Sequence, residues 1–263
     1  RLAGARLVPV PVDSEGLVVS ELERLTESTD VAAVYTTPHH QYPTTVTQSG
    51  PRRQALLRLA ARRRICILED DYHHEYHFAG RPVWPLASDD PRRVVLHIGT
   101  FSKVLAPGLR IGYAVGQAEI IRRMAARRAY TDRQGDLASE RALASMITGG
   151  ELGGHVRRMH RIYRERRACL ASALERELGD ELQFEIPAGG LGLWVTARRG
   201  IDTDAWAEAA LARGVLVHSA RRFRFDGRKG PELRLGFARH DEPELEEAVR
   251  RLRLALRDVT RRP

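Results

Sequence analysis

The stretch Val94-Val-Leu-His-Ile-Gly-Thr-Phe-Ser-Lys103 joins an apolar run to a polar loop that ends in a lysine. Its first half, Val94–Ile98, is rich in β-branched residues and has the length of a buried strand. The pattern continues on both sides, with similar apolar runs at 31–35, 65–68 and 111–115 and helical patterns at 52–63 and 119–130. This alternation predicts an α/β fold with a mainly parallel sheet.

A second region begins with a long helical stretch, from about residue 154 to 178, whose apolar residues recur at helical spacing. The pattern then changes to strand-like segments at 183–186, 193–196, 215–217 and 233–237, with helices at 204–213 and 244–256. Asp202 or Thr203 is suited to cap the first of these helices. We therefore expect two domains, a large one at 1–153 and a smaller α+β domain at 154–263.

Composition sets further limits on the protein. With 263 residues and 43% hydrophobic content the chain can bury a substantial core. The net charge of +9 comes from arginines spread along helices and indicates nucleic-acid binding only weakly. Cys66 and Cys169 form neither a disulfide framework nor a metal site. No apolar segment approaches membrane-spanning length and no signal-peptide pattern is present, so we expect a cytoplasmic protein.

The chain has 43 basic side chains but only two lysines, Lys103 and Lys229. Since arginine serves as the general surface cation here, a lysine in the loop after an apolar run needs its own explanation. A deprotonated lysine amine attacks a carbonyl and forms a Schiff base, whereas a guanidinium stays protonated. Lys103 is therefore a candidate covalent anchor for an aldehyde cofactor. Lys229, in a polar turn-like stretch, is interpreted as solvated.

Polar residues follow each apolar run of the predicted sheet. In open α/β sheets the ligand lies outside the carboxyl ends of the strands. These positions hold the loop 37–43 after the first run, Glu69-Asp-Asp-Tyr72 after the second, and the Lys103 loop after the third. An acid, a phenol and an amine are thus predicted to converge on one edge of the sheet.

Four sequence blocks carry a family resemblance, in the order His40-Gln-Tyr-Pro43, Glu69-Asp-Asp-Tyr72, Gly99-Thr-Phe-Ser-Lys103 and Leu109-Arg-Ile-Gly-Tyr113. They resemble the pyridoxal-phosphate enzymes of the aspartate aminotransferase type, fold type I. More closely, the chain is similar to the aminotransferase-like domain of MocR-type regulators in the GntR superfamily. The segments 155–167 and 187–190 strengthen this narrower match. The resemblance covers nearly the whole chain and implies pyridoxal 5'-phosphate as the cofactor.

The resemblance assigns a role to each matching residue. Lys103 would be the catalytic residue that holds the cofactor. Asp70 would pair with the pyridine nitrogen and keep it protonated; Asp71 competes for this role, but the family spacing points to the first aspartate. Tyr72 and Tyr42 would contact the phenolic oxygen of the cofactor or flank its ring.

Three further residues would bind anionic groups. Thr100 and Arg110 would bind the cofactor phosphate through hydroxyl and guanidinium donors. Arg234 would receive the carboxylate of an amino-acid ligand as a bidentate pair, although one arginine among so many is a weak signal.

The sequence also departs from the family. Thr45 stands where a glycine is usual, and Gly192 where the regulators usually have histidine. The histidine pairs at 39–40 and 73–74 suggest a metal, but neighbouring side chains point apart and no third ligand is evident, so we expect no metal site. Residues 1–13 resemble the middle of the family's large domain. We therefore expect the glycine-containing phosphate turn, a ring-stacking aromatic residue and the winged-helix domain to lie outside this chain, and cofactor retention by it to be weak.

Two function classes share these residues. In the first, the chain is the effector domain of a transcription regulator, which senses an amine or amino acid at Lys103, forms a homodimer, and contacts DNA only through a winged-helix domain. In the second, it is a class I/II aminotransferase that transfers an amino group between an amino acid and a 2-oxo acid. A third interpretation is a degenerate domain kept for dimerisation. The sequence favours the regulator and leaves enzymatic activity open.

Overall fold

The computed structural model describes residues 4–81 and 83–260. The chain divides into two compact units, and the division falls inside its longest helix, α5 (Glu151–Leu178). One unit contains the chain up to Gln41 together with Val46–Arg158, and the other contains Tyr42–Thr45 and the chain from Met159 onward. The domain boundary between residues 153 and 154 stays a prediction.

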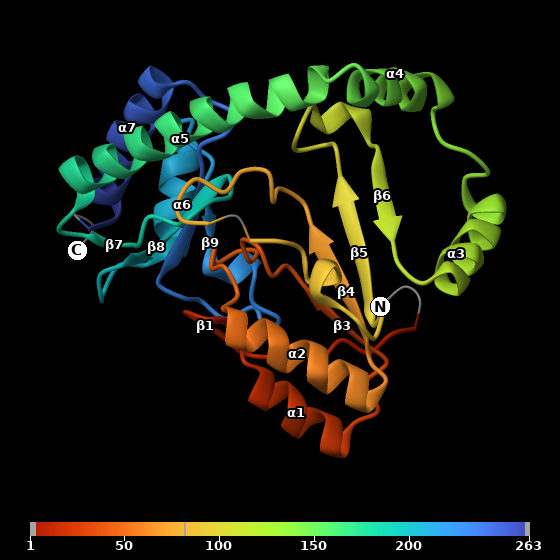
Figure 1. Cartoon of the computed structure of the whole chain (residues 1–263). Helices are drawn as coiled ribbons and strands as arrows, with labels where there is room; N and C mark the ends of the chain where they lie inside the picture. The colour runs from red at the N-terminus through yellow and green to blue at the C-terminus, as the bar shows by residue number, and fades with distance from the viewer. Residues whose placement is uncertain (1–3, 82, 261–263) are drawn as a thin grey trace. The chain divides into compact units, whose positions relative to one another are not determined.

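The first unit is built on a four-stranded sheet (Figure 1). Its elements are β1 (Val12–Asp13), β2 (Gly16–Leu17), α1 (Val19–Ser28), β3 (Ala33–Thr36), α2 (Gly50–Arg63), β4 (Cys66–Asp71), β5 (Val95–Thr100), β6 (Gly112–Val115), α3 (Ala118–Thr131) and α4 (Leu137–Thr148), with 3-10 turns at Leu86–Asp89 and Pro107–Leu109. The strand order is β3-β4-β5-β6, in which the first three strands are parallel and β6 is antiparallel to β5. The predicted α/β fold with a mainly parallel sheet is confirmed.

Local sequence sets both ends of α2. The Ser49 hydroxyl accepts a hydrogen bond from the Arg52 amide at 3.4 Å, and a proline follows it in the first turn. At the other end Arg64 takes a left-handed conformation with a φ of 58°, which stops the helix before β4 begins.

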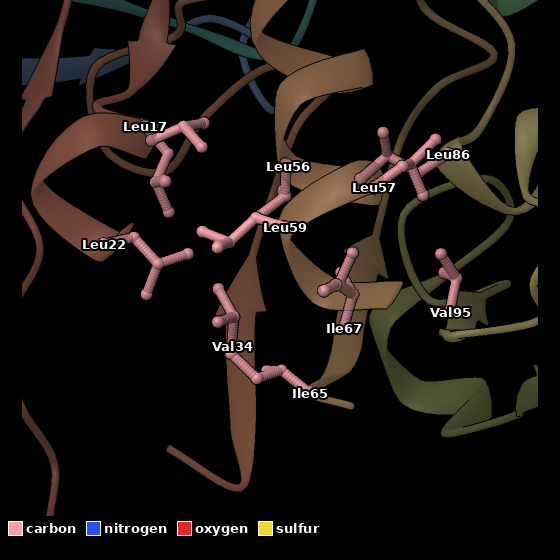
Figure 2. Close-up of a cluster of buried hydrophobic side chains, with 12 residues drawn as sticks. Leu17, Leu22, Val34, Leu56, Leu57, Leu59, Ile65, Ile67, Leu86 and Val95 are labelled. Atoms are coloured by element: carbon pink, nitrogen blue, oxygen red, sulfur yellow. The ribbon is translucent and has the colours of Figure 1, made fainter. Parts of the chain in front are cut away.

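The core of this unit lies on one face of the sheet. Buried leucines of α1 and α2 pack there against apolar residues of three parallel strands (Figure 2). The labelled members are Leu17, Leu22, Val34, Leu56, Leu57, Leu59, Ile65, Ile67, Leu86 and Val95. Burying a side chain of this size contributes about 1.5–3 kcal/mol, so this cluster supplies much of the driving force for folding.

Two strands keep exposed side chains. Tyr35 on β3 is 63% exposed and Val115 on β6 is 56% exposed. The expectation that all four apolar runs form buried strands is therefore wrong for β6, which has no buried residue, and for one face of β3, whose other face holds the buried Val34. Composition predicts a strand, but a strand is buried only where another element covers it. Helices α1 and α2 pack on one face of this sheet.

The second unit is a smaller α+β structure. After α5 come β7 (Leu182–Gln183), β8 (Gly192–Ala197), α6 (Thr203–Ala212), β9 (His218–Ser219), a 3-10 turn at Ala220–Arg222, β10 (Glu232–Gly236) and α7 (Glu242–Thr260). The sheet order is β7-β8-β10-β9, and its neighbours are all antiparallel.

The predicted signals for this unit were largely correct. The Asp202 carboxylate caps α6 by accepting from the amides of Asp204 at 3.0 Å and Ala205 at 3.2 Å. The strand predicted at 215–217 is wrong, because the register with β10 places it at His218–Ser219. Within the described residues, no helix combines the length and apolar character that a membrane crossing requires.

Candidate functional site

Alternation along β4 separates the two neighbouring aspartates. Asp71 is 3% exposed and lies on the same side as the buried Ile67, whereas Asp70 points to the opposite face. The Asp71 carboxylate lies 3.0 Å from Nδ1 of His74 and 3.6 Å from Nδ1 of His39. Asp71 is therefore engaged by the protein interior, and Asp70 is the aspartate that a ligand can reach.

Asp70 accepts a short hydrogen bond from the strand beside it. The Tyr35 hydroxyl on β3 donates to Oδ2 of Asp70 at 2.5 Å. Partial burial of the phenol and this hydrogen bond both raise the pKa of Tyr35 above its usual value, so Tyr35 stays a donor at neutral pH. Sequence reasoning missed Tyr35, and only the pairing of Tyr35 with Leu68, two residues before Asp70, brings it within reach.

The loop after β5 and the residues just before β6 bring together side chains that can donate hydrogen bonds. The Thr100 hydroxyl donates to the Ile111 carbonyl at 3.3 Å and accepts from the Ser102 amide at 3.1 Å. The Arg110 guanidinium donates to the Ser102 hydroxyl at 3.5 Å, from a left-handed backbone with a φ of 51°. The structure thus brings Thr100 and Arg110 together around Ser102, which sequence reasoning did not include in the site.

Lys103 is exposed at the start of the turn that follows Ser102. Its amine makes no hydrogen bond or ion pair with any residue in the described part of the chain. Register places Asp70 beside Ile98, and Thr100 lies two residues further on the same face. Asp70, Thr100 and the lysine loop therefore share the carboxyl edge of β4 and β5.

Tyr72 lies beside a group of buried imidazoles. Its hydroxyl donates to the His40 carbonyl at 2.9 Å. Nδ1 of His40 lies 3.1 Å from Nδ1 of His73, and its Nε2 lies 3.4 Å from Nδ1 of His77. Burial, followed by the neighbouring imidazoles, lowers the pKa of His40 to about 2, so His40 is neutral.

The histidines at 39–40 and 73–74 lie near one another and near His77, which comes from further along the chain. His40 and His77 are stacked at a centroid distance of 5.7 Å, a proximity that the sequence did not predict. Among residues 4–81 and 83–260, no group of three or more His, Cys, Asp and Glu side chains is arranged to hold a metal ion.

The remaining two predicted residues, Tyr42 and Arg234, belong to the second unit and lie together there. The Arg234 guanidinium carbon is 4.9 Å from the centroid of the Tyr42 ring. Nε of Arg234 is buried and has no hydrogen-bond acceptor among the described residues. A Cβ on Gly192 would meet the carbonyl oxygen of Leu235 at 2.9 Å and Nη2 of Arg234 at 3.2 Å, so glycine at this position avoids a clash with the β10 backbone and leaves space for the guanidinium.

The side chains of the first unit suit pyridoxal phosphate by their chemistry. Lys103 offers an uncommitted primary amine, and Asp70 offers a carboxylate for a pyridinium nitrogen. Thr100 and Arg110 offer donors for a phosphate. The assignment of these residues, with Tyr42, Tyr72 and Arg234, to one site stays a prediction.

Comparison with known proteins shows which family the chain resembles. The aminotransferase class I and II profile matches residues 1–252. The chain is 33% identical over 250 residues to aromatic-amino-acid aminotransferase 1 of Thermococcus litoralis, covering 93% of this chain and 60% of that protein. It is 34% identical over 255 residues to the HTH-type transcriptional regulator TauR of Rhodobacter capsulatus, covering 97% of this chain and 51% of the regulator.

Solved structures agree with these matches. A Pyrococcus horikoshii kynurenine aminotransferase in complex with PMP superposes with a TM-score of 0.88 at 32% identity, over 95% of this chain and 63% of that one. An α-aminoadipate aminotransferase of Thermus thermophilus, complexed with N-(5'-phosphopyridoxyl)-L-leucine, gives 0.91 at 28% identity, over 98% and 67%. The chain spans about half to two thirds of these relatives. It belongs to the aminotransferase class I and II family, with the fold of the type I pyridoxal-phosphate enzymes.

Proposed function

We propose that the chain is the pyridoxal-phosphate-binding effector domain of a transcription regulator, and that it senses an amine or amino acid through a Schiff base at Lys103. The observation that supports this most is the uncommitted Lys103 amine on the sheet edge that also holds Asp70 and Thr100. The family implies pyridoxal 5'-phosphate as the cofactor. When bound, it supplies an aldehyde that condenses with primary amines and a ring that withdraws electrons.

The side chains of the first unit divide the work of holding such a ligand. Asp70 keeps a proton on the pyridine nitrogen, because an ionised carboxylate favours the cationic form of its partner. Thr100 and Arg110 direct hydroxyl and guanidinium donors to the phosphate. Tyr35 orients the Asp70 carboxylate by occupying its second oxygen.

In the second unit, Arg234 supplies the carboxylate recognition that an amino-acid ligand requires. Nε of Arg234 is buried without a hydrogen-bond acceptor among the described residues, and an unsatisfied buried donor costs free energy. A carboxylate bound as a bidentate pair would satisfy this donor. The Tyr42 ring holds the guanidinium from one side. We propose a homodimer and a small amine or amino acid as partners, with DNA contacted only by a separate winged-helix domain.

A working aminotransferase is the second candidate. The match to the Thermococcus aminotransferase favours it, because that match is as extensive in this chain as the match to the regulator. The residues that bind the cofactor are shared by both functions. The difference lies in whether the Lys103 amine, once displaced by a ligand, also moves a proton from the ligand's α-carbon.

The test is a titration of the chain with saturating pyridoxal phosphate, followed by borohydride reduction and peptide mapping. We expect a visible absorption band and a cofactor adduct on the peptide that contains Lys103. Lys103→Ala should lose both, and the matched control Lys229→Ala should keep both, because Lys229 is paired with Asp202 at 2.6 Å in the other unit. A band that persists in Lys103→Ala would refute the anchor.

The same protein with bound pyridoxal phosphate also distinguishes an enzyme from a sensor. Adding an excess of an amino acid should shift the absorption band without converting the aldehyde of the cofactor to an amine. Stoichiometric formation of a 2-oxo acid in a single turnover would instead support the aminotransferase.

A further inference from the structure

The first unit contains an open cavity at the amino ends of β4 and β5. Its volume is about 860 Å³, and its lining includes Ile65 and Cys66 at the start of β4 and Val94 just before β5. Asp70 and Thr100 lie at the opposite ends of these two strands. The cavity is therefore separate from the candidate cofactor site by the length of the sheet.

Arginine dominates the charged part of the lining. Five arginines line the cavity and are exposed to solvent at its rim: Arg58, Arg62, Arg64, Arg92 and Arg93. Arg62 pairs with Glu23 at 2.5 Å. The other four guanidiniums make no hydrogen bond or ion pair with any residue that the structure describes.

The acidic groups of the lining do not neutralise these arginines. Asp90 uses Oδ2 to accept the Val95 amide at 2.8 Å, which fixes the turn into β5. Asp89 is exposed and ends a short 3-10 turn. With four unpaired guanidiniums against two carboxylates, the cavity keeps an excess of positive charge.

Two of the arginines occupy backbone positions that disfavour any residue with a side chain. Arg64 has a φ of 58° and Arg93 a φ of 56°, in the left-handed region where glycine is the usual residue. They stand at equivalent places, at the turns into neighbouring strands β4 and β5. Both arginines therefore line the cavity from turns at which glycine would suit the backbone.

One further feature suits an anion. The cavity reaches the start of α3 at Gln117 and Ile120, and the first turn of this helix has no side-chain cap for its amides.

We propose that this cavity binds a small polyanion with at least two phosphate groups. Four guanidiniums with no internal partner give the fork-shaped, charge-assisted donors that phosphate oxygens accept in pairs. A single phosphate would engage only part of this set, which favours a di- or triphosphate.

The probe is inorganic pyrophosphate, measured by calorimetry with the chain at near-physiological salt and saturating pyridoxal phosphate. The test variant is Arg64→Gly/Arg93→Gly, which removes two guanidiniums where glycine suits the backbone, so the fold is retained. Arg133→Gly is the matched control, because Arg133 also has a positive φ, of 60°, and lies outside the cavity lining. Arg110→Ala tests whether the probe binds at the proposed cofactor site instead.

We expect saturable binding to the wild-type chain and a dissociation constant raised about tenfold or more in the double variant, with Arg133→Gly and Arg110→Ala unchanged. Equal affinity in the double variant and the Arg133→Gly control would overturn the proposal. So would loss of binding in Arg110→Ala, or failure of pyrophosphate to bind the wild-type chain. None of these outcomes depends on Lys103.

Discussion

The two faces of β4 show opposite ways of using acidic residues. On the core side, Glu69 is fully buried and accepts the Leu86 amide at 2.6 Å, the Ala87 amide at 3.1 Å and a contact from Nδ1 of His97 at 3.0 Å. On the other side, the Asp70 carboxylate accepts one hydrogen bond from the described residues, that of Tyr35. The core-side carboxylate is satisfied by the protein and supports the fold, whereas Asp70 keeps acceptor capacity for a ligand. Adjacent acids in sequence thus have different roles because a strand alternates its side chains.

The largest expected effect on stability is at Glu69, the carboxylate that the protein's own donors already satisfy. Replacing Glu69 by Ala should lower the free energy of unfolding by about 3–5 kcal/mol, because it removes a buried charged partner and leaves two amides and an imidazole without an acceptor. Urea denaturation followed by circular dichroism measures this change. Asp70→Asn is the control and should change stability by less than about 1 kcal/mol. Equal losses in the two variants would contradict the division between the faces.

An intermediate effect is expected from pH. The pKa of His40 falls to about 2 in the folded protein, so between that value and about 6.5 the unfolded chain binds a proton that the folded chain does not. Stability should therefore decrease as pH falls below about 6.5, by up to about 1.4 kcal/mol per pH unit for this group. Hydrogen bonding to Asp71 raises the pKa of His74, so between about 6.5 and that raised value the folded chain binds a proton that the unfolded chain does not, and this gain offsets part of the loss measured between pH 7.5 and 5.5.

Urea denaturation at pH 7.5 and 5.5 checks the sign. His40→Phe should flatten the dependence, since it removes the buried titrating group while keeping an aromatic ring. A variant with the same slope as the wild type would assign the acid sensitivity to other groups.

The smallest effect on folding stability is expected at Tyr35. The same residue should have the clearest effect on the absorption of the bound cofactor. Tyr35→Phe removes one hydrogen bond to a partly exposed carboxylate and should cost at most about 1 kcal/mol of folding stability. It should still shift the pH dependence of the cofactor's absorption band, because Asp70 loses the donor that orients it. The spectrum of the loaded protein is titrated against pH in both forms. An unchanged titration would show that Tyr35 does not act through Asp70.

Several elements followed from local signals alone. The helical pattern at 52–63 located α2 apart from its first two residues, and Asp202, one of the two caps proposed, located the start of α6. The strand at His218–Ser219 was misplaced because its position depends on pairing with β10 rather than on its own residues. Helices α1 and α4 were not predicted. Thr45 was noted as a departure from a family glycine, and its φ of 64° lies in the left-handed region that glycine adopts without strain.

The sequence by itself determined the α/β class, the family and the identity of the candidate lysine, because apolar periodicity, residue scarcity and ordered motifs are properties of the chain. Only the tertiary structure decided which partners the polar residues have. Tyr35 meets Asp70, Ser102 meets Arg110, and the unpaired arginines meet at one cavity through register and turn geometry between distant segments. Such contacts depend on how strands are paired and which face each side chain takes, and neither is encoded in the residues on one segment alone.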